Sequence, residues 1–160
     1  VMTDLPGTCV SVSTADCIPV LLYDEEHHAV CAVHAGWRGT VRRIVQKALT
    51  DMRAAFHTTP SKVKAVIGPG ISLKNFEVGD EVYDEFAAGG FDMDRIARRY
   101  DKWHINLALC NRLQMEETGV SHEAITDCGV CTYDNIGDYF SARRLGTESG
   151  RICTGIFLKC

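Results

Sequence analysis

The sequence predicts a protein of the mixed α+β (α/β) class, a single domain in which a mixed β-sheet core is flanked by helices. Its 160 residues suit one domain and are too few for two. Short apolar and β-branched runs are interleaved with longer segments whose apolar residues recur at three- and four-residue spacing, a pattern typical of interleaved strands and helices. No internal repeat or low-complexity tract divides the chain, so residues 1–160 are expected to form one domain.

The N-terminal part of the chain predicts a strand followed by a β-hairpin. Residues 10–13 and 18–23 are rich in β-branched and apolar side chains, which favours strands. The charged run at 24–28 is expected to turn the chain, so that residues 29–34 form the returning strand.

A helix is expected after the glycine-flanked loop at 35–39. Thr40 is predicted to cap it, because a threonine hydroxyl can accept a hydrogen bond from a backbone N–H of the first turn. The helix should run from residue 41 to about residue 56. Its apolar residues recur at helical spacing and predict one buried face: Val41, Ile44, Val45, Ala48, Leu49, Met52 and Phe56.

The second half of the chain predicts three strands and two helices. The strands are expected at 62–67, 125–127 and 150–158, the last with alternating apolar residues. One helix is expected from about 79 to 88, with an inward-facing apolar side. The other is expected at 105–118, with core contacts from Leu109, Leu113 and Met115, and Gly119 is expected to stop it.

Composition excludes several classes of function. The 17 Lys and Arg residues against 21 Asp and Glu residues give a net charge of −4, so neither nucleic acid nor a membrane surface is an expected partner. The apolar runs are too short to cross a bilayer and no secretory leader is recognisable, so a cytoplasmic protein is expected. Because the first residue is not methionine, we also expect that a native N-terminal segment is missing.

The eight cysteines are too sparse for a disulfide-built mini-protein, and at least half are expected to be buried thiols. Cys128 and Cys131 form a CxxC motif that, with Cys153 and Cys160, offers four thiolates to a structural zinc. The second pair is spaced more widely than in zinc ribbons, which argues against that site. A thioredoxin-like dithiol is less favoured still, because no helix begins at the motif.

Cys17 and His34 form the first candidate site. In the expected hairpin, a two-residue turn places them opposite each other, and a four-residue loop makes them diagonal neighbours on the same face. Their thiolate and imidazole suit zinc or copper better than magnesium or calcium. A catalytic zinc uses three protein ligands and an open position, so this pair alone leaves the site incomplete. The alternative is a structural pair.

The glycine-flanked turn after His34 is the second candidate. It contains Trp37 and Arg38 at the expected start of a helix, where free backbone N–H groups attract an anion. Arg38 can grip a phosphate with two parallel hydrogen bonds. The alternative is that Trp37 belongs to the core and Arg38 is solvated.

Two long motifs, TADCIPVLL at 14–22 and HAGWRGT at 34–40, closely resemble the laccase-domain family. That family is also called the multicopper polyphenol oxidoreductase family, or the purine nucleoside phosphorylase family with a Cys/His zinc site. The likeness continues in family order through IGPGI at 67–71, FEVG at 76–79, CT at 131–132, FSARR at 140–144 and GR at 150–151. The resemblance therefore extends over nearly the whole chain.

The resemblance implies a zinc site made of one cysteine and two histidines, with Cys17 and His34 at two of these positions. The remaining histidine of the family lies upstream of the cysteine motif, and residues 1–16 contain none. We interpret this as truncation of the chain rather than loss of the site. His27 and His28 lie in the expected turn and are not taken as substitutes.

The resemblance further implies phosphorolysis of adenosine, inosine, guanosine and methylthioadenosine, and deamination of adenosine. Purine nucleosides and phosphate are the implied partners, and Cys17, His34 and Arg38 are the expected catalytic residues. Arg38, Arg143 and Arg144 are expected to bind substrate, unless the last two are solvated or held in an ion pair. Asp16 is expected either to orient a metal ligand or to cap a turn.

Three other functions remain open at this stage. A copper-dependent polyphenol oxidase is the activity behind the older family name, but several copper centres need more histidines than the six present. A cysteine hydrolase would use Cys17 as nucleophile and His34 as base. A non-catalytic module would hold its zinc only for structure. The sequence indicates neither the oligomeric state, nor the preferred purine, nor the proton donor.

Overall fold

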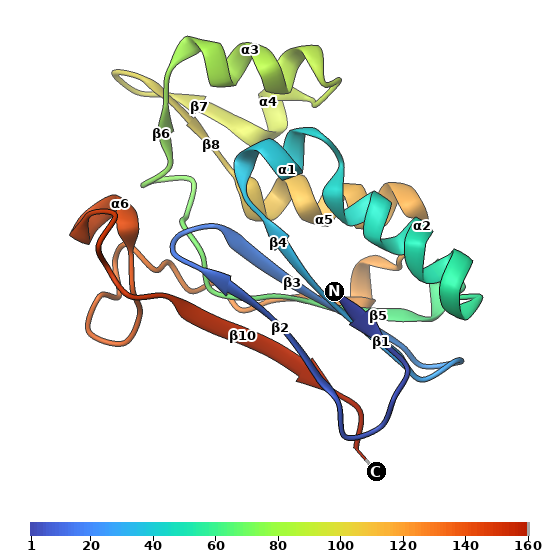
Figure 1. Ribbon diagram of the computed structural model, residues 1–160. Helices are drawn as coiled ribbons and strands as arrows, with labels where there is room; N and C mark the ends of the chain where they lie inside the picture. Colours follow the sequence, from blue (N-terminus) through green and yellow to red (C-terminus); the bar gives the residue numbers. More distant parts are fainter. Residues whose placement is uncertain (160) are drawn as a thin grey trace.

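A mixed five-stranded sheet lies at the centre of the protein in a computed structural model that describes residues 1–159 (Figure 1). The strand order is β1 (Met2–Thr3), β4 (Ala29–Ala35), β3 (Ile18–Asp24), β5 (Val63–Ile67) and β9 (Ile125–Asp127). Neighbouring strands are antiparallel except β5 and β9, which are parallel. The mixed α+β class predicted from the sequence is confirmed.

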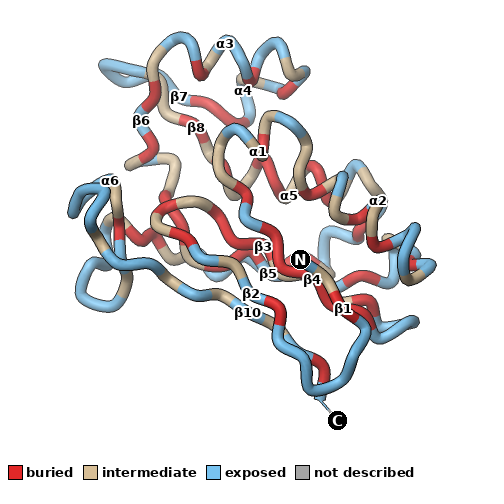
Figure 2. Tube along the Cα trace, in the orientation of Figure 1, coloured by how far each residue is buried: buried red, intermediate tan, exposed pale blue. Residues whose placement is uncertain are grey.

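Helices cover one face of this sheet. They are α1 (Trp37–Val41), α2 (Ile44–Phe56) and α5 (Leu107–Thr118) (Figure 1). Alternate side chains of β3 and β4 point toward them and form the main core with apolar residues of α2 and α5. Figure 2 shows that β3 and β4 are buried along most of their length. Among the described residues, no helix has the length and apolar character that crossing a bilayer requires.

A two-stranded antiparallel ribbon covers the other face of the sheet. It pairs β2 (Cys9–Thr14) with β10 (Ile152–Phe157). A small second cluster of buried apolar residues lies between the ribbon and the sheet and includes Val10, Val30 and Ala32. The strands expected at 10–13 and 150–158 are therefore present but form a layer of their own.

A third unit connects β5 to α5 and was not predicted as strands from the sequence. A three-stranded sheet of β6 (Glu77–Val78), β8 (Trp103–Ile105) and β7 (Ala97–Arg99) lies beside α3 (Asp80–Ala88) and α4 (Met93–Ile96). These strands are too short to show an alternating pattern. The remaining short elements are η1 (Pro60–Lys62), η2 (His122–Ala124) and α6 (Ala142–Leu145).

The expectation of one helix from 41 to 56 capped by Thr40 is wrong. The helix begins earlier, at Trp37, and is interrupted at Arg43, whose φ of 59° is left-handed. Thr40 is buried inside α1, and its carbonyl oxygen accepts from the backbone N–H of Arg43 at 3.0 Å and from Gln114 Nε2 at 2.9 Å. Partners outside the regular helix therefore satisfy this carbonyl where the helix breaks.

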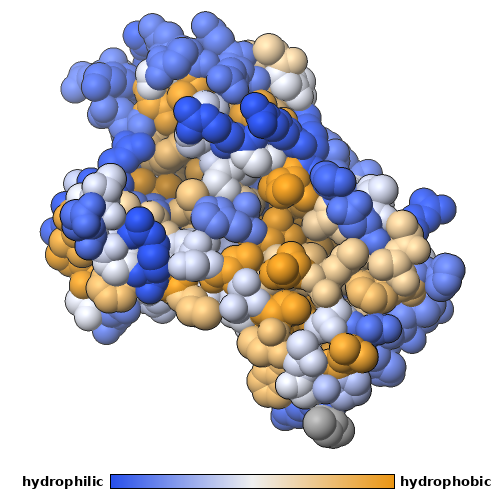
Figure 3. Space-filling model, viewed as in Figure 1, coloured by the Kyte–Doolittle hydropathy of each residue, from blue (hydrophilic) through white to orange (hydrophobic). Residues whose placement is uncertain are grey.

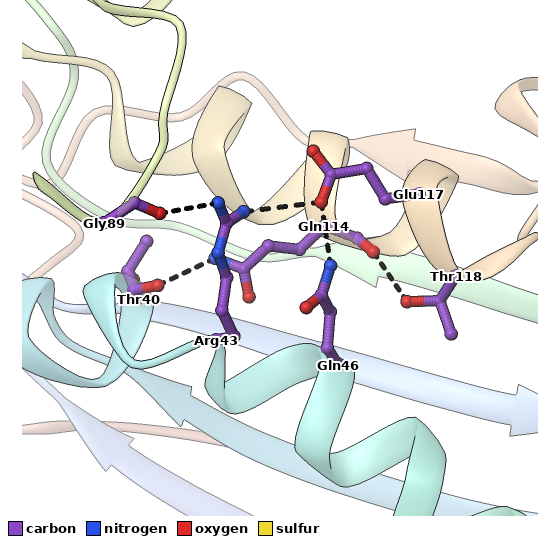
Figure 4. A network of polar contacts seen from close by, with 7 residues as sticks. All are labelled: Thr40, Arg43, Gln46, Gly89, Gln114, Glu117 and Thr118. Carbon is purple, nitrogen blue, oxygen red and sulfur yellow. Dashed lines mark hydrogen bonds and ion pairs between the residues drawn. The ribbon is translucent and has the colours of Figure 1, made fainter. Parts of the chain in front are cut away.

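A polar network fixes the break between α1 and α2 against α5 (Figure 4). Arg43 donates to the carbonyl oxygen of Gly89 at 3.0 Å and to Glu117 at 3.4 Å, and Gln46 donates to the same carboxylate at 2.8 Å. The network holds α1, and with it the turn after His34, in a fixed position on the core.

The other expected elements begin and end within two residues of those observed. Gly119 ends α5 with a left-handed φ of 104°, as predicted. Of the core contacts expected from α5, Met115 is buried, whereas Leu109 and Leu113 are only partly buried. Asn106, which the sequence analysis placed inside the helix, caps it by accepting from the backbone N–H of Leu109 at 3.0 Å.

The buried carboxylate of Asp24, at the end of β3, gives the hairpin turn a dependence on pH. Its side chain is inaccessible to solvent and accepts from the backbone N–H groups of Glu26 at 2.9 Å and His27 at 3.2 Å. Burial by itself raises the pKa of Asp24, but the neighbouring hydrogen-bond donors of Thr58, His27 and Glu26 stabilise the carboxylate and lower the pKa by more. The pKa of Asp24 is therefore lower than its ordinary value.

Asp24→Asn is expected to lower the free energy of unfolding by about 1 kcal/mol at neutral pH. The unfolded chain protonates this carboxyl more readily than the folded chain does. The stabilisation is therefore complete above the unfolded-state pKa of about 3.9 and is lost as the pH falls through the lower folded-state value. Urea unfolding at pH 7 and pH 3 measures the difference in unfolding free energy between wild type and variant. If this difference were as large at pH 3 as at pH 7, the interpretation would be contradicted.

Candidate active site

The side chains of Cys17 and His34 converge over the backbone of Gly36. The loop of the β3–β4 hairpin has four residues, because Asp24 pairs with Ala29, and this register pairs Pro19 with His34. Cys17, two residues before Pro19, is thus a diagonal neighbour of His34 on the same face, as the four-residue alternative predicted. A Cβ atom built on Gly36 would lie 3.0 Å from Cys17 Sγ and 3.8 Å from His34 Nε2.

This pair supplies donors of the right chemistry for zinc or copper, but only two of the three that a catalytic zinc uses. Among residues 1–159, no group of three His, Cys, Asp or Glu side chains is arranged to hold a metal ion. Burial, and then the charge of Asp16, raises the pKa of Cys17. A nucleophilic cysteine needs a lowered pKa, so this environment does not favour the cysteine-hydrolase alternative.

A cavity of about 380 Å³ opens beside Cys17. Its walls are mainly apolar and aromatic, with Trp37 from α1, Phe76 before β6 and Leu107 from α5. Asp16 and Arg143 add a carboxylate and a guanidinium to the lining. The surface is hollowed here, between α6 and the unit that carries β6, β7 and β8 (Figure 3). The cavity is lined mainly by apolar side chains and by a few polar groups, as small-molecule sites commonly are.

Asp16 links three segments that are far apart in the sequence. Its side chain is buried, and Oδ1 accepts from Thr132 Oγ1 at 2.6 Å while Oδ2 accepts from the backbone N–H of Arg143 at 2.8 Å. The first turn of α6 is thereby held against the loop before β3. Ser141 caps α6 by accepting from the backbone N–H of Arg144 at 3.2 Å. These side-chain bonds go to Thr132 and Arg143 rather than to Cys17 or His34, so the orientation of a metal ligand by Asp16 stays a prediction.

The structure separates the three arginines predicted to bind substrate. Only Arg143 lines the cavity, and one of its Nη atoms donates to the carbonyl oxygen of Glu77 at 2.9 Å. Arg38 lies over the ring of Trp37, with Cζ 4.2 Å from the ring centroid. Arg144 donates to the carbonyl oxygen of Tyr133 at 2.8 Å. Within the described residues, neither of these two arginines lines the Cys17 cavity, and their binding roles stay predictions.

Cys131 lines a neighbouring cavity of about 360 Å³ rather than the Cys17 cavity. Its Sγ atom accepts from the backbone N–H of Ser72 at 3.4 Å and from Asn75 Nδ2 at 3.3 Å. Burial by itself raises the pKa of Cys131, but these N–H donors outweigh it and lower the pKa. Sequence reasoning missed this environment, because its donors lie more than fifty positions away in the chain.

The other cysteines give no sign of a second metal centre in the described part of the chain. Cys128 and Cys153 are exposed free thiols, and they belong to no metal-binding group among residues 1–159. Cys160 lies outside the described residues, so the four-thiolate hypothesis stays a prediction. Cys31 and Cys110 are buried, and burial raises the pKa of Cys110 to about 12.

Gly36→Ala is expected to weaken metal binding by about 10- to 100-fold while the fold is kept. The φ and ψ of Gly36, −69° and 166°, are accessible to alanine, but the added methyl group would lie close to both donor atoms, 3.0 Å from Cys17 Sγ and 3.8 Å from His34 Nε2. Metal affinity is measured by competition with a chromogenic chelator, and folding by circular dichroism. Gly39→Ala is the matched control, because its Cβ would make ordinary contacts, with Ile44 at 3.4 Å and 3.5 Å and with the carbonyl oxygen of His34 at 3.8 Å, and would lie near neither donor atom. Equal affinities of the two variants would contradict the expected position of the metal.

Comparisons with known proteins agree with the sequence motifs. The model of the family described as multi-copper polyphenol oxidoreductase laccase matches residues 1–159. A purine nucleoside phosphorylase of Bacteroides thetaiotaomicron is 49% identical over 160 residues, which cover 98% of this chain and 59% of the relative. A protein named adenosine deaminase RL5, from an unknown prokaryotic organism, is 40% identical over 99% of this chain and 61% of its own length.

A solved structure shows the same fold. The crystal structure of the Bacillus licheniformis hypothetical protein YfiH superposes with a TM-score of 0.93 and 28% identity, over 99% of this chain and 60% of that one. The chain thus spans about three fifths of the length of these relatives.

Proposed function

The chain belongs to the multi-copper polyphenol oxidoreductase laccase family, and on that premise we propose that it is an enzyme of purine nucleosides. The proposed reactions are phosphorolysis of adenosine, inosine, guanosine and methylthioadenosine, and deamination of adenosine. Relatives named purine nucleoside phosphorylase and adenosine deaminase, at 49% and 40% identity, support this proposal.

The observation that carries the proposal is that Cys17 and His34 converge over Gly36 and that Cys17 also lines a cavity with aromatic walls. A cavity of about 380 Å³ is within the usual range for small-molecule sites. A purine is a flat, largely apolar ring system, and Trp37 and Phe76 offer it apolar aromatic surface. Arg143 in the same lining can donate hydrogen bonds to ligand oxygens.

Cys17 and His34 are the residues that would hold a zinc ion. Zinc held by these residues would supply Lewis-acid chemistry, which would activate phosphate or water as a nucleophile. In phosphorolysis, a phosphate oxygen bonds to ribose C1′, the glycosidic bond breaks, and the base leaves with a proton. In deamination, water adds at purine C6 and ammonia leaves. The third protein ligand of such a site is not among the described residues.

A copper-dependent polyphenol oxidase is the second candidate, and the description of the matching family favours it. Cysteine and histidine are also good ligands for copper. The two candidates are distinguished by loading the protein with zinc or copper in parallel. Oxygen consumption with a phenolic substrate by the copper form alone, without conversion of nucleosides by the zinc form, would favour the oxidase.

Incubation with adenosine, with and without phosphate, tests the proposed reactions. Chromatography is expected to show adenine and ribose 1-phosphate only when phosphate is present, and inosine in both conditions. If the folded, zinc-loaded protein converted none of adenosine, inosine and guanosine, the proposal would be overturned.

A further inference from the structure

A third cavity, with polar walls, adjoins the Cys17 cavity. It measures about 280 Å³ and is lined by Lys74, Asn75, Glu77, His104, Tyr133 and Arg143. Arg143 lines both cavities, so the two spaces meet at this residue. Lys74 lies outside the motifs that resemble the laccase-domain family.

The charges around this polar cavity are predominantly positive. The carboxylate of Glu77 is paired with Lys102 at 2.9 Å, which offsets its charge. In the described part of the chain, neither Lys74 nor Arg143 forms an ion pair with a carboxylate. Asp134 is the other acid nearby, and it accepts from Asn75 Nδ2 at 2.9 Å.

The groups lining this cavity suit a tetrahedral oxyanion. One Nη atom of Arg143 donates to the carbonyl oxygen of Glu77. The other N–H groups of the guanidinium, and its positive charge, are free to interact with an anion. His104 Nδ1 lies 3.1 Å from the carbonyl oxygen of Leu73, so Nδ1 carries the proton and donates to that carbonyl. Nε2 is left as an acceptor, which suits the P–OH group of a hydrogen phosphate ion. Lys74 adds an exposed ammonium group with three donors.

We propose that Lys74, His104 and Arg143 form a binding subsite for a phosphate group next to the Cys17 cavity. As a subsite of the reaction it rests on the proposed function, because Arg143 would then connect phosphate to the nucleoside. Two sources of this group are compatible with the geometry: inorganic phosphate that attacks the nucleoside, and the 5′-phosphate of a nucleoside monophosphate. Both present phosphate oxygens to the cationic side chains of Lys74 and Arg143, and hydrogen phosphate also carries the P–OH group that His104 Nε2 can accept from.

Direct binding tests the subsite without requiring turnover. Inorganic phosphate and adenosine 5′-monophosphate are titrated separately into the 160-residue protein by isothermal calorimetry. Lys74→Met is expected to weaken the binding of phosphate by about tenfold or more, because a charge-assisted hydrogen bond is lost. Lys62→Met is the matched control: it removes the same charge from an exposed position outside the cavity lining and is expected to bind like wild type.

The pattern of results identifies the source of the phosphate group. If inorganic phosphate is the ligand, Lys74→Met also lowers the ratio of phosphorolysis to deamination at subsaturating phosphate. If a nucleotide is the ligand, adenosine 5′-monophosphate binds more tightly than either adenosine or inorganic phosphate.

The subsite is rejected if neither anion binds to the wild-type protein, or if Lys74→Met and Lys62→Met bind them equally well. Because these readouts are equilibrium affinities, they confirm or reject the subsite even if no nucleoside is converted. Failure of the subsite and failure of the proposed function are therefore separate results.

Discussion

Cys17→Ser is expected to lower the rate of adenosine conversion by about 100-fold or more and to release the bound metal. Serine is close to cysteine in size, but its hydroxyl is a much weaker ligand than a thiolate for zinc or copper. Losing a residue that only orients a metal ligand already lowers metal affinity or activity by about 10- to 100-fold, so losing the ligand itself should lower them at least as much. Product chromatography measures the rate, and mass spectrometry of the purified protein measures the metal content.

Cys153→Ser is the matched control for this experiment. It makes the same chemical change on β10, where the thiol is free and exposed, and it is expected to keep both metal and activity. Circular dichroism of both variants separates loss of the site from loss of the fold. A Cys17→Ser protein that kept its metal and more than half of the wild-type rate would show that the reaction does not depend on this thiol.

The convergence of Cys17 and His34 is predictable from the sequence because it depends on local information. Two apolar strands and a short charged run define a hairpin, and an even number of loop residues keeps the two side chains on one face. The four-residue loop that the structure contains was one of the two even-length alternatives. The side-chain positions over Gly36 follow from this register.

The surroundings of the pair are less predictable, because contacts between distant segments build them. Asp16 meets Thr132 and Arg143 across 116 and 127 positions of the chain. No local pattern indicates which arginine then lines the cavity, and Arg38, although it follows His34 closely, lies on the ring of Trp37 instead.

The same reason explains the error at the start of the first helix. Thr40 follows a glycine and precedes an apolar repeat, which is typical of a capping residue. In the structure its carbonyl oxygen accepts from Gln114 on α5, and this distant partner stabilises a break that the local sequence does not show. The three short strands β6, β7 and β8 likewise depend on pairing between segments that have no strand pattern of their own.

Asp16→Ala is expected to lower the free energy of unfolding by about 3 kcal/mol, the largest loss predicted here for a single side chain. The variant leaves two donors without their acceptor, the fully buried hydroxyl of Thr132 and the backbone N–H of Arg143. Releasing the first turn of α6 would also let Arg143 move away from both cavities, so nucleoside conversion should fall together with stability. Urea unfolding and initial rates at saturating substrate measure the two effects.

Asp16→Asn separates the hydrogen bonds from the shape of the side chain. Its amide oxygen can still accept one of the two bonds, so we expect about half of the loss in unfolding free energy that alanine causes. Asp138→Ala, which removes an exposed carboxylate from the loop between β9 and α6, is the control and should leave the free energy of unfolding within about 0.5 kcal/mol of wild type. If Asp16→Asn and Asp16→Ala were both as stable as this control, the link between the loop before β3 and α6 would not stabilise the protein. The position of Arg143 would then need another explanation, because Asp16 is the side chain that accepts from its backbone N–H.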